Sequence, residues 1–253
     1  MTATIKEYFS SIGDYGIFFM RFFRNIFHLN FEWNEFLRQC YIIGYKSFNI
    51  VLITGFILGF VLTLQSIPTL KEFGALSYVP SMVSISVLRE IGPVITALIC
   101  AGKIGSGIGA ELGSMRVTEQ IDAMEVSGAN PIQYLVVTRI LACIIMQPLL
   151  TLFADAAAIV GGFTGFNTVS DITLSMYYAK SFAKVEFIDF LPSFIKTIFF
   201  GFAIGFIGCY KGMFSVGGTE SVGEAAKSSV VTASIWIIII DAIAVQITTL
   251  LYY

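Results

Sequence analysis

Seven charged residues lie inside long apolar runs of this 253-residue chain, where a charge is costly unless it meets a partner or a water-filled cavity. Their signs nearly balance, with three bases against four acids: Arg89, Lys103 and Lys196, and Glu90, Glu111, Asp155 and Asp241. This balance suggests mutual pairing. Two roles remain open for each residue. The first is structural, as part of an ion pair or as a side chain that snorkels to the membrane interface. The second is a direct role in moving a charged substrate.

The elements that must position these residues are five apolar segments. A spanning helix needs about 20 mostly apolar residues, and the chain offers such runs at residues 47–70, about 79–112, 140–166, 190–210 and 228–253. The whole chain is 56% hydrophobic and 13% charged, with a mean hydropathy of +0.82. We predict an all-α membrane protein with about five transmembrane helices. A net charge of −2 gives no indication of a nucleic-acid partner.

The N-terminal region is aromatic but carries charges, so it does not resemble a span. Apolar residues recur there at three- and four-residue steps, which predicts an amphipathic helix in the membrane interface: Phe9, Ile12, Gly16, Phe19, Phe23 and Phe27. We divide the chain into this interfacial region, residues 1–43, and a transmembrane domain, residues 44–253. Ten of the 15 basic residues lie on the side of the N-terminus, which favours a cytoplasmic N-terminus and an extracytoplasmic C-terminus.

The second apolar run contains small residues at four-residue steps. Gly105, Gly109 and Gly113 lie on one helix stripe, which permits close helix packing in a membrane. The stripe fits packing within one subunit, and it equally fits a subunit interface or a sliding surface. Pro93 predicts a kink, because it removes a backbone hydrogen bond and crowds the carbonyl of Arg89. No phosphate-binding loop is complete in this run, so we expect no ATP site in this chain.

Residues 113–131, GSMRVTEQIDAMEVSGANP, form the most polar interruption between two apolar runs. Thr118 is a candidate helix cap with Glu119 in the first turn, and Gly128 with Asn130-Pro131 ends the helix. The helix would carry an acidic stripe beside an apolar pair: Glu119, Asp122 and Glu125, and Ile121 and Met124. Because so short a helix is unstable alone, it must dock on its own membrane domain or on a partner. A solvated loop is the alternative.

The cysteines and the single histidine show no metal-binding pattern. Cys40, Cys100, Cys143 and Cys209 are widely separated, and His28 has no companion, so we infer neither a disulfide nor a metal site.

The stretch LREIGPVITALICAGKIGSGIGAELGSMRVTEQIDAMEVSGANPIQYLVVTRILA resembles the MlaE family of bacterial ABC-transporter permeases, and YKGMFSVGGTESVGEAAKSSVV resembles that family's second cytoplasmic loop. The resemblance covers about residues 44–251 and is weakest over residues 163–190, the expected loop between the third and fourth spans. It implies a non-enzymatic, homodimeric subunit in the bacterial inner membrane. Its implied function is to move phospholipids between that membrane and the outer membrane or cell exterior.

The resemblance also implies partners. A separate cytoplasmic ATPase would hold ATP and Mg²⁺, an MCE-domain protein would bind lipid outside, and a STAS-domain accessory often accompanies them. The family's coupling helix corresponds to the polar interruption, which assigns ATPase docking to this segment: Glu119, Gln120, Ile121, Asp122, Met124 and Glu125.

From these features we expect two copies to enclose an apolar lipid cavity with charged groups near its polar edges: Arg89, Glu90, Lys103 or Glu111. Two other functions compete with this hypothesis. A secondary transporter would use the buried acids as a proton relay, and a non-transporting scaffold would need no intramembrane charge.

Overall fold

The computed structural model describes residues 2–26 and 31–252, so His28 and Phe27 lie outside the described residues. Every regular element in the described part of the chain is helical, which confirms the predicted all-α class. The elements are α1 (Thr2–Ile26), α2 (Trp33–Glu72), η1 (Leu76–Tyr78), α3 (Val79–Ser86), η2 (Val87–Ile91), α4 (Gly92–Cys100), η3 (Ala101–Gly105), α5 (Ser106–Val117), α6 (Gln120–Val126), η4 (Ile132–Val137), α7 (Thr138–Phe166), α8 (Leu174–Phe182), α9 (Phe187–Met213) and α10 (Thr219–Tyr252).

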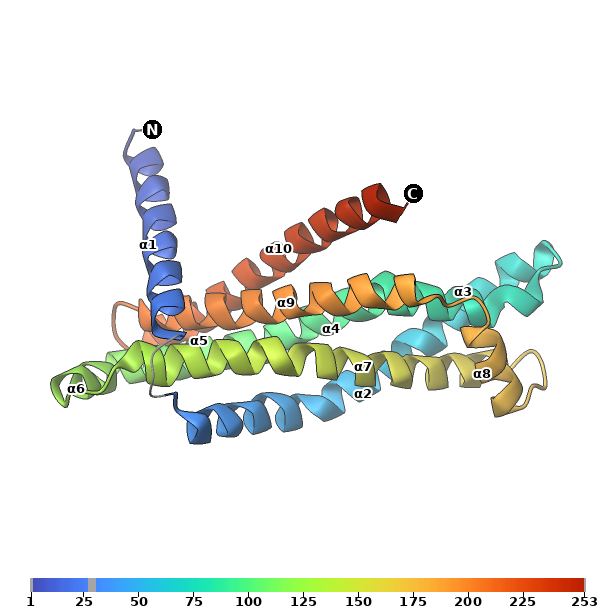
Figure 1. Ribbon diagram of the computed structural model, residues 1–253, viewed down its shortest axis with the longest axis horizontal. Helices are drawn as coiled ribbons and strands as arrows, with labels where there is room; N and C mark the ends of the chain where they lie inside the picture. The colour runs from blue at the N-terminus through green and yellow to red at the C-terminus, as the bar shows by residue number, and fades with distance from the viewer. Residues whose placement is uncertain (1, 27–30, 253) are drawn as a thin grey trace.

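Five helical rods within the described ranges are long and apolar enough to cross a membrane, as predicted. The second rod, Leu76–Val117, is one continuous helix that contains two π-helical segments, η2 and η3. The rods run lengthwise through the molecule, with α6 at one end of the bundle and α8 near the other (Figure 1). We refer to these as the α6 end and the α8 end.

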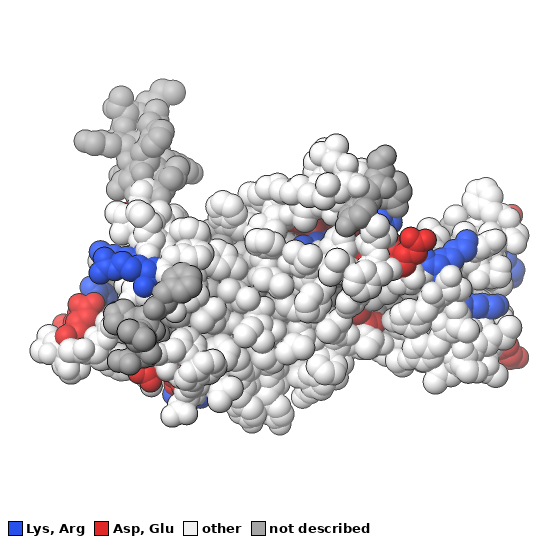
Figure 2. Space-filling view, viewed as in Figure 1, with Lys and Arg blue, Asp and Glu red and all other residues white. Residues whose placement is uncertain are grey.

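The surface supports a membrane position for this bundle. Figure 2 shows Lys, Arg, Asp and Glu side chains gathered towards the two ends of the molecule, while the long middle is almost wholly uncharged in this view. Large apolar side chains of the spans are more than half exposed, among them Ile53, Ile57 and Ile238. A soluble protein rarely exposes so continuous an apolar surface, whereas lipid tails accept it.

The core forms where helices approach without intervening side chains. A Cβ atom at Gly55 or Gly59 of α2 would overlap the backbone of Ala154 or Ala158 in α7, and one at Gly161 would overlap the backbone of α2. In lipid, helix association depends on such close van der Waals contact rather than on the hydrophobic effect. The backbones of α2 and α7 are therefore in direct contact along this helix pair.

The predicted N-terminal helix is present as α1, and it crosses the direction of the bundle (Figure 1). Its aromatic side chains fix it to α9. Phe18 and Phe22 are 2% and 1% exposed, and the Tyr15 ring stacks on Tyr210 with centroids 3.8 Å apart. Such aromatic pairs stabilise beyond their buried area. The helix that follows, α2, is continuous through residue 43, the proposed domain boundary.

Residues 163–190, expected as a loop, contain the helix α8. Thr173 caps it by accepting a hydrogen bond from the Met176 backbone amide at 3.4 Å. Tyr177 is completely buried and packs edge-on against Phe163, with ring centroids 5.6 Å apart. The helix α8, capped by Thr173 and anchored by the buried Tyr177 ring, therefore closes this end of the bundle.

Candidate functional site: a membrane charge cluster and a polar helix

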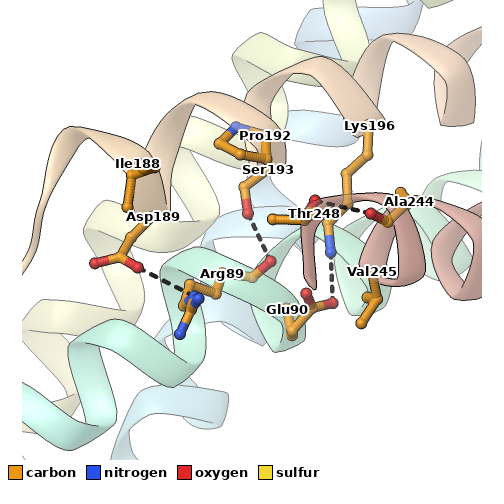
Figure 3. Close-up of a pocket in the computed structure, with 10 residues that line it drawn as sticks. All are labelled: Arg89, Glu90, Ile188, Asp189, Pro192, Ser193, Lys196, Ala244, Val245 and Thr248. Carbon is orange, nitrogen blue, oxygen red and sulfur yellow. Dashed lines mark hydrogen bonds and ion pairs between the residues drawn. The ribbon is translucent and has the colours of Figure 1, made fainter. Parts of the chain in front are cut away.

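Lys196 of α9 contacts two carboxylates, and Figure 3 shows its side chain reaching one of them, Glu90. Its Nζ atom lies 2.5 Å from Oε2 of Glu90 in η2 and 2.9 Å from Oδ1 of Asp241 in α10. The lysine is only 4% exposed, whereas Glu90 is 46% exposed. Three residues singled out in the sequence thus converge from three elements, because burial of an ammonium requires carboxylates around it.

A second ion pair lies beside this group. Arg89 Nε contacts Asp189 Oδ1 of α9 at 3.1 Å, and Figure 3 shows the two side chains reaching toward each other. Asp189 was missed because the predicted fourth span began at Phe190, whereas α9 begins at Phe187. We call the five residues the charge cluster: Arg89, Glu90, Asp189, Lys196 and Asp241.

Pro93 shapes the backbone that carries Arg89 and Glu90. The chain adopts π geometry over η2, with the Gly92 amide donating to the Val87 carbonyl, and returns to α geometry with Pro93 in the first turn of α4. Pro93 has no N–H to donate to the Arg89 carbonyl four residues earlier. The Ser193 hydroxyl of α9 donates to that carbonyl at 2.5 Å instead. A hydrogen bond from another helix therefore holds η2 in place.

An apolar cleft adjoins the charge cluster. It spans about 1030 Å³, including the open space at its mouth, and its walls come from η2, α3 and α10: Ile85, Ser86, Arg89, Glu90, Ile91, Val245, Thr248 and Thr249. Ligand sites commonly combine such apolar walls with a few polar groups. Arg89 and Glu90 belong both to this cleft and to the pocket drawn in Figure 3, so a guest in the cleft would meet one charge of each sign.

Lys103 and Glu111 are not part of the charge cluster. Glu111 Oε1 lies 2.9 Å from a guanidinium nitrogen of Arg139, which is 2% exposed. Lys103 donates to the backbone carbonyl of Lys46, and both lysines line a separate groove between α2 and the second rod. Sequence reasoning placed Arg139 outside the third span, although the helix begins seven residues earlier, at Ile132.

The glycine stripe of the second rod packs within this chain. A Cβ atom at Gly109 would overlap the Ser229 hydroxyl of α10, and one at Gly113 would touch Ala225 of the same helix. Gly105 faces Ile204 of α9. A Cβ atom at Gly107, on the next face, would meet no other atom within 4 Å, so that side of the rod is open.

The polar interruption forms the short helix α6 at the far end of the bundle (Figure 1). Ile121 is 1% exposed and Met124 packs against the same core, so the apolar pair faces this chain's own membrane domain. Glu119 and Glu125 remain exposed, and Val126 is 90% exposed. Asp122 forms an ion pair with Arg116. The face left free is therefore acidic with one apolar side chain.

The predicted cap of this helix is wrong. Thr118 donates to the Ser114 carbonyl at 2.8 Å and so completes the end of α5. Glu119 is the N-cap, with a φ of 58° that side-chain-bearing residues rarely adopt. This left-handed residue turns the chain sharply between α5 and α6. Its exposed carboxylate can then project from the corner.

Gly128 closes the other end of α6, and Asn130 starts the next helix. The Gly128 amide donates to the Glu125 carbonyl at 3.0 Å, and Asn130 Oδ1 accepts from the Ile132 amide at 3.1 Å to start the next helix. The Asn130 side-chain amide also donates to Asn25 Oδ1 of α1 at 2.7 Å. A side-chain hydrogen bond therefore links the N-terminal helix to the segment between α6 and η4.

The four cysteines lie in the described residues, and all four are free thiols. No group of three or more His, Cys, Asp or Glu side chains in that part of the chain is arranged so that it could hold a metal ion.

A multi-pass helical bundle with buried charges, an adjoining cleft and a projecting polar helix defines a membrane permease. The family described as "Permease MlaE" matches residues 36–247. A "Probable ABC transporter permease protein" of Rickettsia bellii is 38% identical over 229 residues, which is 90% of this chain and 88% of the relative. One from Pyropia yezoensis is 38% identical over 82% of this chain and 79% of the relative, and one from Synechocystis is 36% identical over 80% and 77%. The chain belongs to the MlaE permease family.

Proposed function

We propose that this chain is the membrane subunit of a transporter that moves phospholipids between the bacterial inner membrane and the outer membrane or cell exterior. The observation that carries the proposal is the apolar cleft that ends at Arg89 and Glu90. A phospholipid presents acyl chains and a charged head group, and the cleft offers apolar walls beside one base and one acid. A zwitterionic head group could place its phosphate near Arg89 and its ammonium near Glu90.

We infer that two copies assemble with their clefts facing each other. One cleft is open to the surface and provides only one wall of an enclosure, whereas a symmetric pair would surround two acyl chains. The exposed residues of α10 that border the cleft, including Val245 and Thr249, would then lie near the dimer axis.

The ATPase partner that an ABC permease requires would bind the α6 end, which we place in the cytoplasm with the N-terminus. The free surface of α6 supports this assignment, because exposed Glu119, Glu125 and Val126 offer charge and one apolar contact to a partner. ATP and Mg²⁺ would be held by that partner, so hydrolysis would not occur on this chain. An MCE-domain lipid-binding protein at the α8 end, together with a STAS-domain accessory, would complete the assembly.

The test is reconstitution of the native complex in vesicles. We expect the purified chain to bring an ATPase and bound phospholipid with it, identified by mass spectrometry and lipid extraction, and to move labelled phospholipid only when ATP is hydrolysed. Loss of flux on collapse of a proton gradient at constant ATP would identify a secondary transporter. Unchanged flux after Arg89→Gln with Glu90→Gln would contradict the proposed role of the cleft.

A further inference from the structure

One oxygen of a buried carboxylate outside the charge cluster has no hydrogen-bond partner among the described residues. Asp155 lies near the middle of α7 and is 5% exposed, and no hydrogen bond from the described residues reaches its Oδ1 atom. A carboxylate that is removed from water without a donor or counter-charge is strongly disfavoured. The structure around Asp155 must therefore supply a positive charge from somewhere else.

Neighbouring protein cations are already engaged. Lys196 binds Glu90 and Asp241, and Arg89 binds Asp189. The other elements packed around Asp155 offer hydroxyls and backbone, with no ion pair to Asp155 among the described residues: Thr54 and Gly55 of α2, and Gly92 and Thr96 of α4.

Two small cavities flank the Asp155 carboxylate. One lies towards α2 and α4 and is bordered by the hydroxyl residues Thr54 and Thr96. The other lies towards α9 and is bordered by Thr151, Ser193 and Thr197. Each has room for about one water-sized guest. The walls are otherwise largely apolar, and the carboxylate with these hydroxyl residues offers the oxygen ligands that small hard cations prefer.

The site is also in contact with the backbone of the transport site. A Cβ atom at Gly92 would overlap Asp155 Oδ1, so the carboxylate lies directly against the first residue of α4, which follows η2. Gly92 is two positions from Glu90. Occupancy at Asp155 would therefore act on the segment that carries the charged residues of the cleft.

We propose that Asp155 binds one small monovalent cation, H⁺ or Na⁺, which neutralises the carboxylate and stabilises the packing of α7 against α4. Either ion supplies the same chemistry, a single positive charge at an oxygen site. The cation is a resident ligand, and ATP remains the energy source for transport. This inference does not depend on the substrate proposed above, because its test measures stability.

The experiment compares the thermal midpoint Tm of the full-length protein in detergent with that of Asp155→Asn, which has nearly the same shape but no charge. Asp171→Asn, at an exposed acid of the α7–α8 connection, is the matched control. Each variant is measured across pH with Na⁺ or a bulky organic cation at constant ionic strength. The other acids are common to the three proteins, so their contribution to the pH dependence of the Tm cancels in the comparison.

If Na⁺ is the ligand, Na⁺ raises the Tm of the wild type and of Asp171→Asn but not that of Asp155→Asn. If H⁺ is the ligand, acidification raises the Tm of the wild type relative to Asp155→Asn, without any Na⁺ effect. Equal responses of the wild type and Asp155→Asn to both ions would overturn the proposal.

Should Asp155→Asn fail to fold, infrared spectra of the wild type decide. A buried carboxylic-acid band, or a carboxylate band that shifts with Na⁺, supports the site, and the absence of both overturns it.

Discussion

At the scale of single residues, the charge cluster carries unequal numbers of charges. Two cations, Arg89 and Lys196, meet three carboxylates, so the group has a formal charge of +2 − 3 = −1. Lys196 is the residue that this arrangement cannot lose, because it is buried and contacts two acids at once. Removing one member of a buried ion pair is more disruptive than replacing the whole pair.

We expect Lys196→Met to lower the free energy of unfolding by up to about 3 kcal/mol, less than for a fully buried pair because Glu90 is partly exposed. Adding Glu90→Gln and Asp241→Asn should recover part of the loss. Thermal unfolding in detergent measures both effects. Lys71→Met, at an exposed residue at the end of α2, is the control and should leave the Tm unchanged. Equal stability of Lys71→Met and Lys196→Met would contradict the arrangement.

The hydrogen bond from Ser193 to the Arg89 carbonyl gives a second prediction. Ser193→Ala should cost about 1 kcal/mol, because it removes the hydroxyl that donates to the part-buried Arg89 carbonyl. In a Pro93→Ala background the alanine introduced at this position has a backbone N–H that can donate to the same carbonyl, so the Ser193→Ala cost should largely disappear.

A double-mutant cycle measures this coupling. Thr197→Val, one turn further along α9, is the matched control and should cost the same in both backgrounds, because the Thr197 hydroxyl donates to its own helix. An additive result for Ser193→Ala and Pro93→Ala would show that Pro93 does not create the need for Ser193.

At the scale of elements, α6 presents two different faces. Ile121 joins the core of the membrane domain, while Glu119, Glu125 and Val126 stay free. Asp122 is committed to Arg116 within this chain, so it cannot serve a partner without breaking that pair. The three acids that share a stripe in the sequence therefore differ in role.

We expect Glu119→Lys with Glu125→Lys to abolish capture of the ATPase in pull-downs and to uncouple ATP hydrolysis from lipid movement. Because neither carboxylate contacts the core, the Tm should remain close to that of the wild type. Asp122→Asn is the control, and it should lower the stability of α6 modestly while ATPase capture persists. Undiminished ATPase capture by the double variant would show that α6 does not dock through this face.

The elements were predictable because hydropathy is a local property. All five spans were found, and the helical N-terminus followed from aromatic spacing, but three helices begin well before the predicted apolar runs, at Trp33, Ile132 and Thr219. The ion-pair partners of the charged residues were harder to predict from the sequence, because pairing depends on how the helices are aligned against each other. Asp189 and Arg139 were missed because the predicted spans began too late. The left-handed conformation of Glu119 has no sequence signal, because glutamate does not favour it.

At the scale of the whole molecule, the two ends of the bundle are built from different elements. The α6 end combines the polar helix with α1, and the α8 end is closed by a packed helix (Figure 1). The apolar cleft opens between η2 and α10, on the side of the bundle. A single copy therefore exposes its candidate substrate site to the surrounding lipid.

The proposed dimer predicts a specific cross-link. With the native cysteines replaced, Thr249→Cys at the cleft edge should form a disulfide or a short bifunctional cross-link between two copies in membranes. Ile57→Cys, on the exposed face of α2, should remain monomeric under the same conditions. Cross-linking at Ile57 in preference to Thr249 would place the dimer axis on the opposite face. Analysis by gel electrophoresis distinguishes the two outcomes.

The direct backbone contact between α2 and α7 has a mechanical consequence. Where carbonyls of one helix occupy the space of absent side chains on the other, rotation of α2 about its axis would bring bulky neighbours such as Phe56 or Leu58 against Ala154 and Ala158. The pair therefore works as a fixed frame during a transport cycle. Motion initiated at α6 would have to pass into α5 and α10, so the cleft would open and close by displacement of its α10 wall against a stationary support.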